Sequence, residues 1–147
     1  MRPRRVVTLP PAFALPAGTL LAQRIVVREA VDAVLAGAGT KDHLDTLTAE
    51  LAVAIELRKL AIARPRHHLV PREQLVALSE PLAAAVDAVA SVKARHTEAG
   101  RAGCNHDQRQ GLLGLADIVD QMRDALPRSL WLMAIRTTLD RIKCPAN

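Results

Sequence analysis

The sequence predicts an all-α fold, an antiparallel bundle of about five helices preceded by an extended, proline-rich N-terminal arm. Hydrophobic residues make up 50% of the 147 residues but aromatic residues only 1%, with Phe13 and Trp131 alone. We therefore expect an aliphatic core, built from leucine, alanine and valine, which favour or tolerate helices. No segment alternates β-branched or aromatic residues with polar ones, so we expect no sheet.

The chain is long enough for one domain with its own core, which we place at residues 18–147. Residues 1–17 contain Pro10, Pro11 and Pro16 and are expected to be an extended arm. The basic start and the apolar run after it have the outline of a secretory signal, but these prolines would interrupt its helix. No stretch of about 18 residues lacks both charges and helix breakers, so we expect no membrane span and a cytoplasmic protein.

Two helices are expected on either side of a glycine turn. The first should run from Thr19 to Ala36, and its expected core residues are Leu20, Val27, Val31 and Val34. Gly37 and Gly39 permit a left-handed helix end, and Thr40 can cap a second helix that stops before Pro65. This segment lacks the spacing and the preceding strand of a phosphate-binding loop, so we interpret it as a turn. The second helix should bury Leu44, Leu47, Leu51, Ala54 and Ile55.

Three later segments repeat apolar residues at alternating spacings of three and four, the pattern of helices that pack in seams. A third helix should start at Pro71, and Pro81 should bend it or restart it with Ser79 as the cap. Asn105 and Gln108 have capping-box spacing before a fourth helix. After a short turn at Pro127, a fifth helix should pack on the fourth as an antiparallel hairpin. Its expected apolar stripe is Leu132, Ile135, Leu139 and Ile142.

These seams suggest helix association within the chain or between chains. We therefore predict a non-enzymatic interaction or assembly protein that acts through helix-helix contacts with a protein partner or with itself as a homo-oligomer. The interface candidates are Leu75, Leu78, Leu82, Val89, Leu112, Leu115, Val119 and Met122.

The net charge of +5 supports an alternative function, a basic accessory subunit that binds the nucleic-acid backbone. The basic residues concentrate in the arm and in the linker after the second helix, where we expect His67 and His68 to join the patch and Arg58 and Lys59 to support it. The nucleic-acid or anion-binding candidates are Arg2, Arg4, Arg5, Arg64, Arg66 and Arg72. The near absence of aromatic residues argues against base stacking. Only four of the twenty basic residues are lysine, so a GC-rich coding sequence explains the bias equally well.

No catalytic constellation is evident, so we predict neither an enzyme nor a cofactor. Ser79, Ser91 and Ser129 do not lie in a strand-to-helix elbow that would activate a nucleophile. Three carboxylates, Asp117, Asp120 and Asp124, share one face of the fourth helix. They are interpreted as a solvated surface, with paired carboxylates or metal ligands as the alternative.

The expected hairpin would bring four possible metal ligands to one pole of the bundle: His96, Cys104, His106 and Cys144. Their spacing matches no compact zinc finger. We interpret the cysteines as free thiols and predict no metal site, with a disulfide or a zinc ion as the alternatives.

Overall fold

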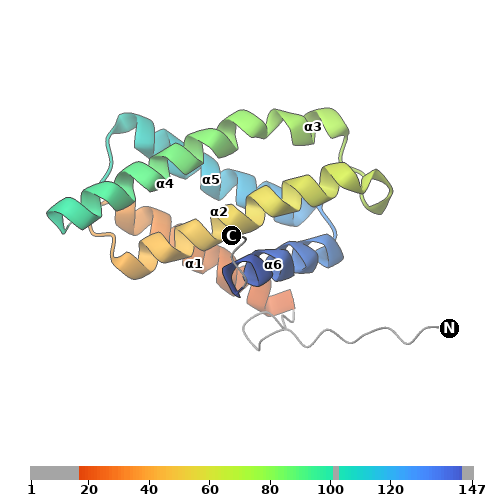
Figure 1. The fold of residues 1–147 in the computed structure, drawn as a ribbon, viewed down its shortest axis with the longest axis horizontal. Coiled ribbons are helices and arrows are strands. Elements are labelled where there is room, and N and C mark those ends of the chain that lie inside the picture. Colours follow the sequence, from red (N-terminus) through yellow and green to blue (C-terminus); the bar gives the residue numbers. More distant parts are fainter. Residues whose placement is uncertain (1–16, 101–102, 144–147) are drawn as a thin grey trace.

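The computed structural model describes residues 17–100 and 103–143, with side-chain surroundings from Arg24 onward. The elements in these residues are all helical: α1 (Ala17–Leu35), α2 (Lys41–Ala63), the short 3-10 helix η1 (Pro65–His67), α3 (Arg72–Ala77), α4 (Ser79–Ala99), α5 (His106–Ala125) and α6 (Arg128–Lys143). They form a helical bundle (Figure 1), which confirms the predicted all-α fold. Most of the predicted arm, including Arg2, Arg4 and Arg5, lies outside the described residues.

The turn between α1 and α2 is a glycine cap followed by a threonine cap, as predicted. Gly37 has a φ of +74°, and its N–H donates to the Val34 carbonyl at 3.0 Å while the Ala38 N–H donates to Ala33 at 2.8 Å. These two bonds close a Schellman motif. Thr40 then caps α2 in a capping box with His43, the third residue of the helix. His43 Nδ1 accepts from the Thr40 N–H at 3.0 Å.

The turn between α4 and α5 uses the same pair of devices. Gly100 ends α4 with a φ of +69°. The Asn105 side chain accepts from the Gln108 N–H at 2.9 Å, and the Gln108 side chain accepts from the Asn105 N–H at 3.0 Å. The predicted capping box is therefore confirmed, and α5 runs antiparallel to α4 (Figure 1).

One aliphatic core runs through the bundle. The predicted core residues of α1 from Val27 onward and four of the five of α2 are buried, whereas Ile55 is only partly buried. The apolar stripe of α5 is buried throughout, at Leu112, Leu115, Val119, Met122 and Leu126. At the α4–α5 contact the helices approach closely, because a Cβ placed on Gly111 would lie 2.9 Å from the Ala84 carbonyl oxygen and 2.9 Å from Ala88 Cβ.

The expected third helix is divided at Leu78 into α3 and α4. Pro81 is the third residue of α4, where its missing N–H is tolerated because the first turn has no helical carbonyls to pair with. The helix thus restarts, but the capping position is Leu78 and Ser79 is the first helical residue. Pro71 likewise precedes α3 as its N-cap.

The predicted hairpin between the last two helices is wrong. α5 packs mainly against α4, and α6 packs against α2 (Figure 1). The expected α6 stripe is right at Ile135, which is buried, but Leu132 and Leu139 are only partly buried and Ile142 is 68% exposed. Leu126 is extended before Pro127, so the apolar phase of α5 does not carry over into α6. The face that α6 buries consists of Leu130, Trp131, Ala134, Ile135 and Thr138.

By length and mean hydropathy, the helical stretch Arg72–Ala99 is the one among the described residues that could cross a membrane. A core helix has the same composition, and Leu82, Ala85 and Val92 of this stretch are buried in the bundle. The stretch is also interrupted at Leu78.

Candidate functional site

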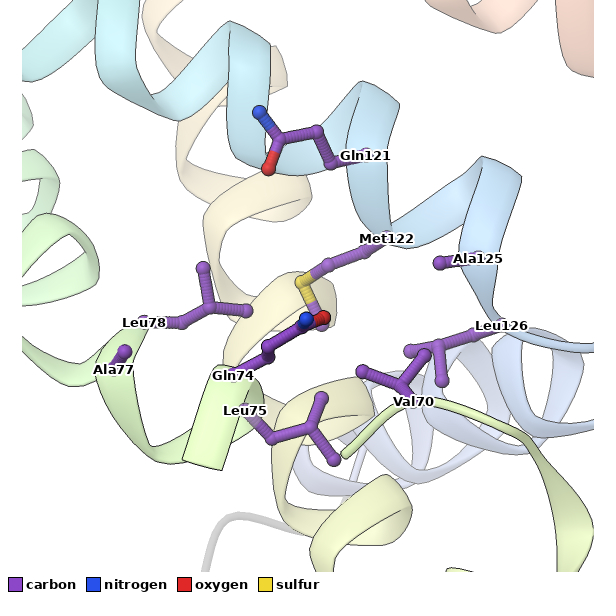
Figure 2. A pocket seen from close by; sticks show the side chains of 9 residues that line it. All are labelled: Val70, Gln74, Leu75, Ala77, Leu78, Gln121, Met122, Ala125 and Leu126. Carbon is purple, nitrogen blue, oxygen red and sulfur yellow. The ribbon is translucent and has the colours of Figure 1, made fainter. Parts of the chain in front are cut away.

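An apolar pocket of about 290 Å³ opens between α3 and the C-terminal end of α5 (Figure 2). Its floor and walls are aliphatic, and two glutamines from opposite helices, Gln74 and Gln121, add amide groups. The lining residues are Val70, Gln74, Leu75, Ala77, Leu78, Gln121, Met122, Ala125 and Leu126. We call this the α3–α5 pocket.

Apolar side chains also lie on the surface beside this pocket. Leu69 is 99% exposed, although it directly precedes the lining residue Val70. Val76 of α3 is 46% exposed, and Leu78 is partly exposed at the break between α3 and α4. A single exposed leucine is ordinary, but these exposed apolar residues are next in sequence to residues that line an apolar pocket, and an exposed apolar patch is typical of a binding surface.

His68 holds the linker that forms one wall of the pocket. Its Nε2 lies 2.7 Å from the Ala61 carbonyl oxygen in the last turn of α2, and its Nδ1 accepts from the Val70 N–H at 3.1 Å. The second bond requires an unprotonated Nδ1, so Nε2 carries the proton and donates a hydrogen bond to the Ala61 carbonyl oxygen. His68 is therefore a structural residue, and the expectation that it adds to an exposed basic patch is wrong.

Arg58 also has a structural role. Its Nε donates to the Leu75 carbonyl at 2.8 Å near the end of α3, where the same carbonyl also accepts from the Leu78 N–H at 3.3 Å. Arg58 thus ties α2 to the wall of the pocket through backbone carbonyls, and it forms no ion pair with another described residue.

The three described arginine candidates do stay exposed. Arg64, Arg66 and Arg72 surround the linker between α2 and α3, and none of them takes part in an ion pair with another described residue. Figure 1 shows this linker at the end of the bundle where α5 also ends. Val70 of the same linker lines the pocket, and we call these three arginines the basic rim.

The eight interface candidates are used mainly inside the chain. Seven of them are buried, and only Leu78 is partly exposed. Leu75, Leu78 and Met122 line the α3–α5 pocket. The seams therefore contribute to the core of the bundle, and they leave no leucine seam on the surface of the described residues.

The three aspartates of α5 face arginines of α1. Asp117 and Asp124 stay about two-thirds exposed, as expected for a solvated surface, whereas Asp120 is mostly covered. Arg28 Nε donates to Asp120 at 3.1 Å, Arg24 forms an ion pair with Asp124, and Arg28 lies 3.8 Å from Asp117. The hydrogen bond and the charge of Asp120 raise the pKa of Arg28. The matched spacing of Arg24 with Arg28 and of Asp120 with Asp124 is a sequence signal that could have indicated this helix pairing.

A charged pair is buried where α2, α5 and α6 meet. Arg123 Nη2 donates to Glu50 at 2.8 Å, and its guanidinium lies 4.7 Å from the ring centre of Trp131. Only 3% of the Arg123 side chain is exposed, and its Nε and Nη1 have no hydrogen-bond partner in the described part of the chain. Burial raises the pKa of Glu50 and lowers that of Arg123, and in each case the partner's charge opposes the change. This cluster belongs to the core.

The four possible metal ligands are not brought together in the residues that can be placed. Cys104 is partly buried against the core, His106 is exposed, and Cys144 lies outside the described residues. No group of three or more histidine, cysteine or acidic side chains in the described ranges could hold a metal ion. The state of the two cysteines stays a prediction.

The α3–α5 pocket was not foreseen from the sequence. The signal that could have indicated it is the apolar pair Leu69–Val70 in a basic linker, outside every helical stripe.

Comparisons with protein-family models, with curated proteins and with solved structures found no match to this chain.

Proposed function

We propose that this chain is a helical interaction module that binds a segment of another protein in the α3–α5 pocket. The observation that carries the proposal is an open aliphatic pocket whose lining residue Val70 directly follows the fully exposed Leu69 in the sequence. Covering Leu69 and Val76 together with the pocket would remove their apolar surface from water, which is the main favourable term in protein association.

The size of the pocket supports a protein segment over a small molecule. Its volume of about 290 Å³ is at the lower end of the range for small-molecule sites. For comparison, a cavity of about 150 Å³ holds one benzene ring. One or two large apolar side chains would fill it. A small ligand in the pocket would leave Leu69 exposed, and a bound segment would cover both.

Nucleic acid is the competing partner, because the basic rim could contact phosphates. Such binding would account for Arg64, Arg66 and Arg72 but not for the exposed leucine or the aliphatic pocket. The affinity for nucleic acid would also fall as the salt concentration rises, with the slope expected for about three neutralised phosphates. It would not depend on the pocket.

Filling the pocket tests the proposal. Ala125, the last residue of α5, lines the pocket and is exposed, so Ala125→Phe should occupy the pocket without disturbing the core. Ala77→Phe fills the pocket from α3 as a second variant. Ala99→Phe is the matched control, because Ala99 is the exposed last residue of α4 at the other end of the bundle.

Peptides selected from a random display library on the wild-type chain should lose binding to both pocket-filling variants and retain it with Ala99→Phe. Circular dichroism of each variant would verify that the helices are intact. If all selected peptides bind the filled variants as tightly as the wild type, the pocket is not the binding site.

A further inference from the structure

The charges around the α3–α5 pocket indicate which kind of segment it accepts. We infer that the partner segment is acidic, with one or two large apolar side chains that enter the pocket and with aspartate or glutamate residues that face the basic rim. This inference rests on the proposed function and adds the chemistry of the partner.

The first argument is the imbalance of charge beside the pocket wall that the linker forms. Arg64, Arg66 and Arg72 are exposed and form no ion pair with a described residue, while Glu73 is the acidic residue in the first turn of α3. Arg128, two residues after Leu126, adds a further exposed positive charge at the start of α6. Like charges placed against this rim would be repelled, so it favours acidic segments and rejects basic ones.

The second argument concerns the negative charges of α5, the helix that forms the other wall. Asp120 and Asp124 of α5 are held by Arg28 and Arg24 of α1 and lie on the face of α5 that meets α1. They are thus partly neutralised within the fold. The three arginines of the rim have no such partner in the described residues, so their charges are available to an approaching acidic segment.

A second copy of this chain is a poorer occupant. A symmetric dimer through this face would place the two basic rims against each other, because a twofold interface brings the same surface patch from both subunits together. The repulsion between the rims favours a different, acidic partner.

The length of the exposed apolar region suits one short segment. Val70 and Leu126 line one end of the pocket and Leu78 the other, with Gln74 and Gln121 between them (Figure 2). The two amide side chains can both donate and accept hydrogen bonds, so they can pair with backbone groups that a bound segment leaves free. Aliphatic contacts would then provide affinity, and the rim would provide selectivity for charge.

The peptides selected on the wild-type chain test the inference when their sequences are read and their binding is measured on a charge-reversed variant. The variant replaces Arg64, Arg66 and Arg72 with glutamate, and the control variant replaces the exposed Arg109 and Arg136 with glutamate. Pocket-dependent peptides should be enriched in acidic and large apolar residues. Loss of three exposed ion pairs should weaken their binding at least about tenfold, and the control variant should leave it unchanged.

The outcomes separate the two proposals. Peptides that lose binding to Ala125→Phe but are not acidic, and that bind the charge-reversed variant normally, would overturn the acidic partner and leave the pocket intact as a binding site. Peptides insensitive to Ala125→Phe would overturn the proposed function itself. A single-stranded RNA probe that binds the wild type and Ala125→Phe equally, and loses binding to the charge-reversed variant, would assign the rim to nucleic acid and contradict the inference.

Discussion

His68 Nε2 lies 2.7 Å from the carbonyl oxygen of Ala61, so the imidazole joins the end of α2 to the linker that forms a wall of the α3–α5 pocket. Replacing His68 with alanine removes this bond and the one from the Val70 N–H. We expect a loss of about 1 kcal/mol in the free energy of unfolding and faster hydrogen exchange at Val70. Urea unfolding and amide exchange measure the two effects.

His67 provides the control for this change, because it is exposed at the end of η1. His67→Ala should alter neither quantity. If the two alanine variants behave alike, His68 does not hold the wall.

The close contact of α4 and α5 predicts opposite effects for two glycines of the same helix. Gly111→Ala places a methyl group against the Ala84 backbone and Ala88, so overpacking should exceed the gain in helix propensity and destabilise the chain by about 1 kcal/mol. Gly114→Ala meets no atom within 4 Å and should stabilise it by about 0.5 kcal/mol. Equal shifts in the urea midpoint would show that the helices are farther apart.

The buried pair of Glu50 and Arg123 predicts strong coupling between the two positions. Arg123→Met leaves the carboxylate of Glu50 without its cation and should cost about 3 kcal/mol of the free energy of unfolding. Replacing Glu50 with methionine as well removes the uncompensated charge, so the double variant should recover most of that loss. A double-mutant cycle by urea unfolding measures the coupling. Additive losses would place the two charges in solvent.

The same pair predicts the direction of a pH effect. Burial raises the pKa of Glu50 above its ordinary value of 4.5, and Arg123 partly offsets the rise. Between the ordinary pKa of this carboxyl in the unfolded chain and its higher pKa in the folded chain, the folded chain keeps a proton that the unfolded chain releases. The free energy of unfolding therefore falls as the pH rises through this interval. Without Arg123 the rise in pKa should be larger.

Arg123→Met should therefore lose more stability relative to the wild type near neutral pH than in mild acid. In the Glu50→Gln/Arg123→Met background this difference should vanish, because no carboxyl remains to titrate. A deficit that is the same at both pH values would exclude Glu50 as its source. Urea unfolding at the two pH values provides the comparison.

Much of the bundle follows from local patterns in the sequence. The caps at Thr40 and Asn105 and the end of α1 at Gly37 depend on side-chain and backbone chemistry within a few residues, so spacing was enough to predict them. The α5 stripe was predictable for a similar reason, because its period persists over the whole helix.

The rest depends on which helices meet, and local patterns do not determine that choice. The extended Leu126 changes the direction of the chain before α6. Continuing the apolar repeat of α5 into α6 therefore predicts a buried Ile142, whereas the structure buries Trp131 and Ala134. The buried charge of Arg123 depends on Glu50, which is 73 residues away in the sequence. The α3–α5 pocket is likewise formed by segments distant in sequence, and only the apolar Leu69–Val70 pair was visible locally.

Photocrosslinking from position 69 tests the central claim most directly. The chain would carry benzoylphenylalanine at Leu69 in the source cell, with a control probe at Ile142, which is 68% exposed on α6. We expect position 69 to give an adduct whose crosslinked peptide is acidic and apolar, absent from the control and lost when Ala125→Phe is added. An adduct from position 69 that persists in Ala125→Phe, or no adduct specific to position 69, would contradict binding in the α3–α5 pocket.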